Sequence, residues 1–166
     1  MVYLGRSARR GAVGVVDNGE FREFVLEAEP RLRRALIAAY GTERGREAAA
    51  EALAYAWEHW PKVMAMDNPV GYLYRVGRSR TRSRQVRPLF QRADNSEPAF
   101  EPKLPGALER LSERQRVAVV LVHAYGWTLR EVAELTGVRI STVQTHVERG
   151  LRHLQRELGG PNDAAA

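Results

Sequence analysis

The chain of 166 residues has no cysteine, which excludes disulfide bonds and thiolate metal sites. No apolar run approaches the roughly 20 residues that a membrane-spanning helix needs. Residues 1–20 contain arginines but no continuous apolar segment, so they lack the pattern of a signal peptide. These absences favour a protein of a reducing cytosol that forms one or two small globular domains and does not insert into a membrane.

Residues that carry enzymatic chemistry are scarce as well. The four histidines, His59, His123, His146 and His153, are scattered along the chain. None has a partner His or Cys at the spacing of metal ligands, and neither a Ser–His–acid set nor a phosphate-binding P-loop is present. We therefore expect a protein that is not an enzyme and that needs no metal or other cofactor.

Lysine is nearly absent, although the chain is strongly basic. The net charge is +6 and the isoelectric point about 10.1, yet only Lys62 and Lys103 among the 26 basic residues are lysines. The planar fork of arginine suits phosphates and base edges. A GC-rich genome would favour arginine equally well, so the position of the charges is more informative than their sum.

Acidic residues are missing from residues 70–92, which hold seven arginines. The following stretch has three prolines, mixed charges and little apolar periodicity, as linkers do. Both flanking halves have helical periodicity, and neither has the alternation of strands. The sequence therefore predicts an all-α protein of two small domains, with a flexible arm at 1–18, domains at 19–92 and 107–159, a flexible linker at 93–106 and a flexible tail at 160–166.

In the C-terminal half, "TLREVAELTGVRISTVQTHVERGLRHL" (residues 128–154) has the start and stop signals of two short helices. Thr128, like Ser112 before it, is followed three residues later by Glu or Gln, the spacing of a capping box. A helix that starts at Ser112 should stop near Gly126. Gly137 is placed to end the next helix, and Ser141 to cap the last one. The last helix has apolar residues on one face, at Val143, Val147, Leu151 and Leu154. This spacing predicts a helix-turn-helix.

The other face of that last helix is polar and suits phosphates and base edges in a major groove. The candidate DNA-binding residues of this half are Thr128, Arg139, Ser141, Thr142, Gln144, Thr145, His146 and Arg149. A helical hairpin with a solvated polar face is the alternative. His146 is interpreted as a surface or phosphate contact rather than a metal ligand.

The N-terminal half begins with a short amphipathic pattern over residues 21–28, which should end before Pro30. Pro30 can start a second helix, because a missing N–H has no cost at the first helical position, and Gly41 should close it. A third helix is expected over residues 43–60. One face of it carries glutamates at spacings of 4 and 7, which is either a docking face or an ordinary solvated face.

The stretch "DNPVGYLYRVGRSRTRSRQVR" follows. Asn68 can cap a helix that has Pro69 at its first position. Arginines beside tyrosines suit nucleic acid, because the cations contact the backbone and the rings stack on unpaired bases. The candidates are Tyr72, Tyr74, Arg75, Arg78, Ser79, Arg80 and Arg82. A basic segment that binds polyanions without selectivity is the alternative.

Two segments carry a family resemblance. "LERLSERQRVAVVLVHAYGWTLREVAELTGVRISTVQTHVERGLRHLQREL" resembles region four of bacterial RNA polymerase sigma factors, although LuxR-type regulators share nearly the same helical module. "FREFVLEAEPRLRRALIAAYGTERGREAAAEALAYAWEHWPKV" with "NPVGYLYRVGRSRTRSR" resembles region two of the extracytoplasmic-function (ECF) sigma factors. Together they cover about residues 19–158.

The resemblance implies a sigma factor that binds core RNA polymerase, through the beta-prime clamp helices and the beta flap, and promoter DNA. In the family, region two melts the minus-ten element and region four holds the minus-thirty-five element. The positions that match the polymerase-binding helix are Glu47, Glu51, Ala54 and Glu58. Three positions depart from frequent family residues: Ala50 stands for a glutamine, Ser79 for an asparagine and Ser83 for an aspartate.

The resemblance also implies a cytoplasmic, nucleoid-associated protein, and an anti-sigma factor or accessory protein as a further partner. Two other interpretations stay open. One is a degenerate sigma-like interaction protein that holds polymerase or another regulator without starting transcription. The other is a polymerase-independent helix-turn-helix regulator, which would bind a palindromic operator as a dimer.

Overall fold

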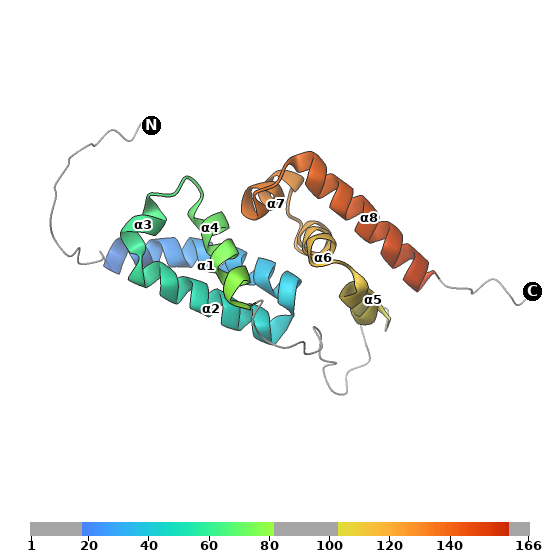
Figure 1. The fold of residues 1–166 in the computed structure, drawn as a ribbon, viewed down its shortest axis with the longest axis horizontal. Coiled ribbons are helices and arrows are strands. Elements are labelled where there is room, and N and C mark those ends of the chain that lie inside the picture. The colour runs from blue at the N-terminus through green and yellow to red at the C-terminus, as the bar shows by residue number, and fades with distance from the viewer. Residues whose placement is uncertain (1–17, 82–102, 160–166) are drawn as a thin grey trace, which may run out of the picture.

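The computed structural model describes residues 18–81 and 103–159, and all regular structure in these two ranges is helical (Figure 1). The prediction of an all-α fold is confirmed. The N-terminal half contains α1 (Asn18–Tyr40), α2 (Thr42–Glu58), α3 (Trp60–Met64) and α4 (Pro69–Thr81). The C-terminal half contains α5 (Leu104–Arg110), α6 (Glu113–Val119), the π-helical turn η1 (Val120–Ala124), α7 (Leu129–Thr136) and α8 (Ile140–Leu158).

The boundaries differ from the expected ones at two places. Asn18, assigned to the arm, is the first residue of α1. Of residues 103–106, assigned to the linker, Lys103 is the N-cap of α5 and the other three belong to its first turn. Leu104 and Pro105 open α5, where a proline has no hydrogen bond to lose. The rest of the expected arm, linker and tail lies outside the described residues, as do residues 82–92.

The expected break at Pro30 is wrong, because α1 runs through this residue without interruption. A proline inside a helix costs about 3 kcal/mol. The helix nevertheless buries a face on both sides of it, with Ala28 before and Leu32 after. An ion pair between Arg33 Nε and Glu29 Oε1, at 3.1 Å, spans the same turn. The burial of this face offsets the missing hydrogen bond.

The helix starts and stops follow the local sequence closely. Asn68 Oδ1 accepts a hydrogen bond from Gly71 N at 2.8 Å, and both Ser112 and Thr128 form complete capping boxes. Gly137 ends α7 in the left-handed conformation, with φ of 71°. These predictions are confirmed. Each could be made from the sequence because the groups involved are only three or four residues apart.

The expected cap at Ser141 is wrong. α8 begins at Ile140, and Arg139 stands at its N-cap without a side-chain cap hydrogen bond. The turn after Gly137 is therefore two residues shorter than expected, since the N-cap is Arg139 and not Ser141. Ser141 lies inside the first turn of α8, and its backbone oxygen accepts from Thr145 Oγ1 at 2.9 Å.

α1 and α2 cross closely in the N-terminal half. The contact face of α2 consists of small buried residues: Gly45, Ala48, Ala49, Ala52 and Ala56. At Gly45 the approach is so tight that a Cβ would lie 2.4 Å from Ile37 Cα. The far end of the pair is closed by aromatic rings, with Phe21 edge-on to Trp60 at 5.0 Å between ring centroids.

In the C-terminal half, the π-helical turn η1 sets the path of the chain between α6 and α7. The helical segment ends before Gly126, as expected, and Gly126 adopts φ of 68°. Trp127 N then donates to Leu121 O at 2.9 Å. The indole ring of Trp127 is thereby held 5.1 Å from the guanidinium carbon of Arg31 on α1.

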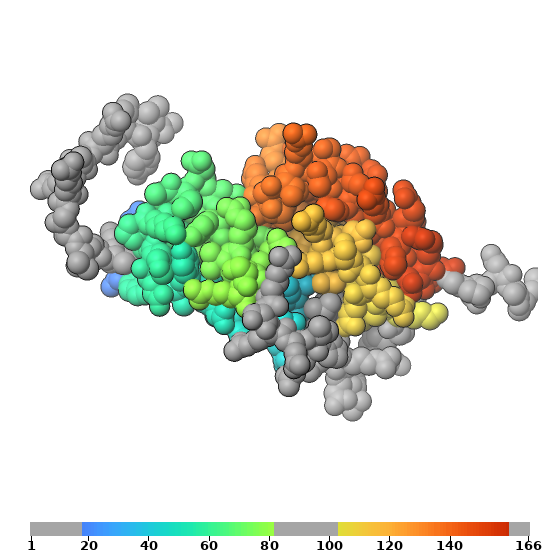
Figure 2. All heavy atoms as spheres, viewed as in Figure 1, coloured from blue at the N-terminus to red at the C-terminus, as the bar shows by residue number. Residues whose placement is uncertain are grey.

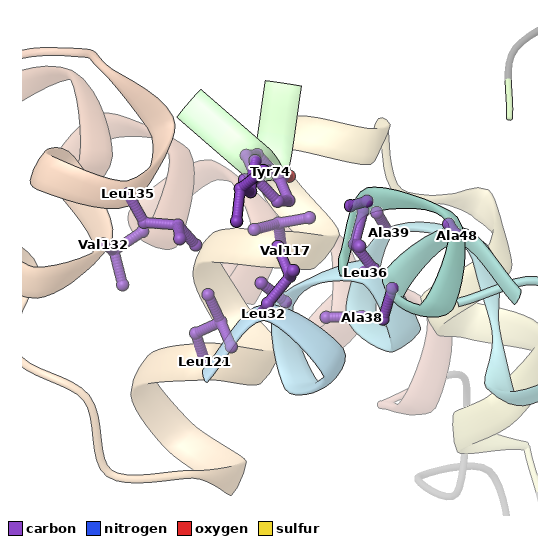
Figure 3. Packing of buried hydrophobic residues seen from close by; sticks show 14 of the residues in the cluster. Leu32, Leu36, Ala38, Ala39, Ala48, Tyr74, Val117, Leu121, Val132 and Leu135 are labelled. Carbon is purple, nitrogen blue, oxygen red and sulfur yellow. The ribbon is translucent and has the colours of Figure 1, made fainter. Parts of the chain in front are cut away.

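The two halves share one hydrophobic core, where the sequence predicted separate domains. α1 packs against α6 and η1, and α4 packs against α7, so the surfaces of α4 and α7 lie side by side in Figure 2. Figure 3 shows the buried side chains that both halves contribute: Leu32, Leu36, Ala38, Ala39, Ala48 and Tyr74 from the first half, and Val117, Leu121, Val132 and Leu135 from the second. Small bundles bury a limited share of their surface, so a common core adds to the stability of both.

Replacement of Gly45 by alanine tests the α1–α2 crossing. Because the added Cβ would overlap the backbone of α1, we expect Gly45→Ala to lower the free energy of unfolding by about 1–3 kcal/mol. Gly106→Ala is the matched control. A Cβ added there would meet no atom within 4 Å beyond its chain neighbours and its own helix backbone, and alanine favours a helix. Equal stabilities of the two variants in urea unfolding, followed by circular dichroism, would contradict the close crossing.

Candidate nucleic-acid and polymerase interfaces

The polar face of α8 is the first candidate interface. Val143 and Val147 of α8 are buried against the rest of the half, which turns the opposite side of the helix outward. Exposed on that side are Arg139, Ser141, Gln144, Thr145 and Arg149, while Thr142 is half-buried. This is an outward-facing row of hydroxyl, amide and guanidinium groups on one helix. Such groups can contact phosphates and base edges.

Besides Thr145, whose hydroxyl donates to Ser141 O, two residues of the candidate set have side-chain hydrogen-bond partners. The hydroxyl of Thr128 donates to Glu131 Oε2 at 2.8 Å and accepts from Glu131 N at 3.2 Å. Hydrogen bonds from the backbone and side chain of Thr128 lower the pKa of the Glu131 carboxyl. Gln144 Nε2 donates to Glu148 Oε1 at 3.0 Å. Thr128 therefore caps a helix, and Gln144 must exchange a partner before it can contact a base.

His146 is set apart from the exposed residues of α8. It is half-buried and lines a cavity of about 70 Å³ between the two halves, which Tyr74 and Glu113 also line. Burial, together with the charges of Arg114 and Arg149, lowers the pKa of its imidazole. His146 is partly covered in this arrangement, because the N-terminal half packs beside it, and its role as a surface or phosphate contact stays a prediction.

The basic helix α4 has two different sides. Arg75, Ser79 and Arg80 are exposed and Tyr72 is half-buried, whereas Tyr74 is only 2% exposed. Burial raises the pKa of the Tyr74 phenol well above its usual range. The prediction that Tyr74 is available for stacking on a base is wrong here, because its ring belongs to the shared core. Arg82 lies outside the described residues.

Arg78 is on the same side of α4 as Tyr74, one turn further along. Its Nε atom lies 2.8 Å from Glu113 Oε1 at the start of α6. The other oxygen of that carboxylate, Oε2, accepts a hydrogen bond from Tyr40 Oη at 3.3 Å. Arg78 is thus engaged by an acid of the C-terminal half.

The open side of α4 forms a patch with three residues that the sequence reasoning missed. We call Tyr55, His59, Lys62, Tyr72 and Arg80 the α2–α4 aromatic patch. The hydroxyls of Tyr55 and Tyr72 are 2.9 Å apart, and the His59 ring stacks on Tyr55 at 4.1 Å. The guanidinium of Arg80 lies 5.4 Å from the Tyr55 ring centroid, and Lys62 Nζ lies 5.9 Å from that of Tyr72.

The electrostatics of this patch favour a polyanion. Hydrogen bonds from Tyr55 and then Lys62 lower the pKa of Tyr72, and hydrogen bonds to the two tyrosines raise the pKa of Lys62. His59, Lys62 and Arg80 are exposed and the two tyrosines are half-buried, so rings and cations alternate as they do in sites for unpaired bases. Tyr55, His59 and Lys62 are spaced by 4 and 3, a signal that sequence reasoning could have used.

The candidate polymerase-binding residues share one side of α2. Glu47, Ala54 and Glu58 are exposed and Glu51 is half-buried, with spacings of 4, 3 and 4. Glu47 and Glu51 line a small hollow that Arg44, Arg80 and Thr81 also line. The face therefore carries acids along its length but has two arginines beside the first pair.

No group of three or more His, Asp or Glu side chains in residues 18–81 and 103–159 could hold a metal ion. No helix in these ranges is long and apolar enough to cross a membrane.

Comparisons with known proteins bear on both halves. Residues 103–154 match the sigma-70 region 4 family. The chain is 32% identical over 72 residues to the RNA polymerase sigma factor CarQ of Myxococcus xanthus, a match that spans 43% of this chain and 41% of that protein. It also has the fold of the sigma factor RpoE of Bartonella quintana, solved in complex with the anti-sigma factor NepR. That likeness has a TM-score of 0.61 at 21% identity and covers 86% of this chain and 99% of the other.

The family match covers α5 to most of α8, the segment that holds the helix-turn-helix and its exposed polar face. The likeness to the solved sigma factor extends the shared fold to most of the chain. Residues 103–154 are similar to the sigma-70 region 4 family, and the predicted resemblance of the chain to RNA polymerase sigma factors of the ECF type is confirmed.

Proposed function

We propose that this protein is an ECF-type sigma factor that binds core RNA polymerase and directs it to promoters. The observation that carries the proposal is the outward polar face of α8 within residues that match sigma-70 region 4. α8 reads the upstream promoter element in the major groove. In this role the protein is an initiation factor without catalytic activity of its own, and it works at the nucleoid.

The N-terminal half supplies the other two contacts of such a factor. The side of α2 with Glu47, Glu51, Ala54 and Glu58 docks on the clamp helices of the beta-prime subunit, and the beta flap contacts the C-terminal half. The α2–α4 aromatic patch holds an unpaired strand of the downstream element. Its rings can stack on bases, and its cations can contact the phosphate backbone. Two DNA contacts on one chain raise the effective concentration of the second.

The closed arrangement of the two halves favours a second candidate, a sigma-like interaction protein that binds polymerase without starting transcription. Burial of Tyr74 and engagement of Arg78 remove two of the expected strand contacts. An anti-sigma factor is a proposed partner in either case, since the similar protein of Bartonella quintana was solved with one.

Run-off transcription with purified core polymerase on genomic promoter fragments tests the function. Discrete transcripts that depend on the protein are expected, and Arg149→Ala should reduce them about tenfold or more, because a base or phosphate contact of α8 is lost. Binding of Arg149→Ala to core polymerase should match that of the unchanged protein. Core binding without transcripts would favour the interaction protein, and no core binding would favour a polymerase-independent DNA-binding regulator.

A charge reversal on α2 tests the docking face. Glu51→Arg should weaken binding to core polymerase at least about tenfold. It replaces a negative charge by a positive one at an interface whose partner surface is complementary to acids. Glu23→Arg makes the same charge change at an exposed position of α1 and should leave the affinity unchanged. A thermal melt of both variants separates docking from local repulsion by Arg44. Unchanged affinity of a folded Glu51→Arg would leave this side of α2 as an ordinary solvated face.

Salt dependence tests the α2–α4 aromatic patch. The affinity for a single-stranded oligonucleotide should fall as salt rises. Lys62→Ala and Arg80→Ala should each make the plot of log affinity against log salt shallower, by about 0.7 to 1 in the magnitude of its slope. Arg22→Ala, an exposed cation on α1, is the control and should leave the slope unchanged. If all three variants had the same slope as the unchanged protein, the patch would not be a strand-binding surface.

A further inference from the structure

The contact between the two halves covers one side of α4 selectively. Tyr74 is buried by it, and Arg78 is half-buried with its guanidinium on Glu113. At the start of α4, Asn68 Nδ2 donates to the backbone oxygen of Glu134 on α7 at 2.7 Å. α4 is therefore held along its length by α6 and α7.

The other candidate interfaces stay open in the same arrangement. Ala54 and Glu58 on α2 are exposed, and so are Arg139 and Arg149 on α8. His59, Lys62 and Arg80 of the α2–α4 aromatic patch are exposed as well. The closed arrangement covers the Tyr74–Arg78 side of α4 and part of His146 on α8.

Glu113 has the chemistry of a stand-in for a DNA phosphate. A carboxylate and a phosphate present oxygens to a guanidinium in the same way, and each forms charge-assisted hydrogen bonds with it. Glu113 makes its contact from the first turn of α6, where the helix dipole favours a negative charge. Its second oxygen is held by Tyr40 of α1. One carboxylate thus joins α1, α4 and α6.

We propose that the C-terminal half is an intramolecular gate on α4, in which Glu113 occupies Arg78 in place of a phosphate of the separated DNA strand. The inference rests on the proposed role of α4 in strand binding. The closed chain can dock on polymerase and present α8 to duplex DNA. It cannot offer the Tyr74–Arg78 side of α4 to an unpaired strand until the two halves part.

The contacts that hold the two halves closed are of moderate strength. The Arg78 and Glu113 side chains keep 23% and 25% of their surface exposed, so water screens their attraction. Arg116, which bonds to backbone oxygens of α1, holds the halves together in addition to this pair. The apparent affinity of a strand is its intrinsic affinity multiplied by the open fraction. A weaker ion pair should therefore raise the apparent affinity by the factor by which it raises that fraction.

Glu113→Gln tests the gate, because it keeps the shape of the side chain and removes the charge. The chain has no cysteine, so dyes can be placed on cysteines introduced at Leu26 and Gln155, exposed residues of α1 and α8. We expect Glu113→Gln to lower energy transfer between these dyes. Its affinity for a short single-stranded oligonucleotide, measured by fluorescence anisotropy, should rise about two- to fivefold.

Glu23→Gln is the matched control, since it removes the same charge from an exposed position of α1. It should change neither energy transfer nor the affinity by as much as twofold. Saturating oligonucleotide should lower energy transfer in the unchanged protein. Equal energy transfer in Glu113→Gln and the unchanged protein would overturn the role of the ion pair, and opening without a gain in affinity would overturn the gate.

Tyr40→Phe provides a second variant, because it removes the hydrogen bond to Glu113 and keeps the buried ring. It should change energy transfer and affinity in the same direction as Glu113→Gln, by a smaller factor, and no change in either would count against the gate. Failure of the proposed function has a separate signature. An open Glu113→Gln protein that binds no oligonucleotide would refute the role of α4 in DNA binding, whereas tight binding by both closed and open forms would refute only the gate.

Discussion

The arrangement of the two halves depends on one buried guanidinium. Arg116 is 5% exposed, and its Nε and Nη2 atoms donate to the backbone oxygens of Ala38 and Ala39 at 3.0 and 2.6 Å. Nη1 donates to Leu111 O at 3.1 Å, just beyond the end of α5. The last carbonyls of a helix have no partner within it, and a cation there is favourable. One side chain therefore joins the end of α1 to the end of α5.

An arginine is required for this role, because its planar fork aims several donors in fixed directions. Burial lowers the pKa of the group, yet a guanidinium stays charged in proteins. Loss of one partner would leave buried carbonyls or a buried charge unsatisfied, which costs more than a typical hydrogen bond contributes. Val117, the next residue of α6, and Leu121 belong to the core that the two halves share.

The sequence predicted what neighbouring residues decide. The capping boxes at Ser112 and Thr128 and the turn at Gly137 could be recognised because their partners are three or four positions away. The helical character of both halves and the outward face of α8 followed from periodicity in the same way. The break at Pro30 was predicted wrongly, because burial along α1 outweighs a local penalty that sequence reasoning weighs alone.

The arrangement between the halves was beyond such reasoning. Arg116 and its partner Ala38 are 78 positions apart, and Tyr40 and Glu113 are 73 apart. No periodic pattern connects residues at such separations. Tyr74 therefore belonged equally well to a DNA surface or to a core, and only the packing of α7 against α4 assigns it to the core. In the α2–α4 aromatic patch, the spacing of Tyr55, His59 and Lys62 is a local signal, but their contact with Tyr72 and Arg80 of α4 depends on the packing of separate helices.

The π-helical turn η1 determines the rotational setting of α8. Its wide turn carries Trp127 to a position where the ring lies against Arg31. Each helical residue advances the chain by about 1.5 Å and rotates it by about 100°. A chain shorter by one residue in η1 would present α7 and α8 about a quarter-turn away from their present orientation. The angular orientation of the polar face of α8 relative to the N-terminal half is thus fixed by the length of five residues.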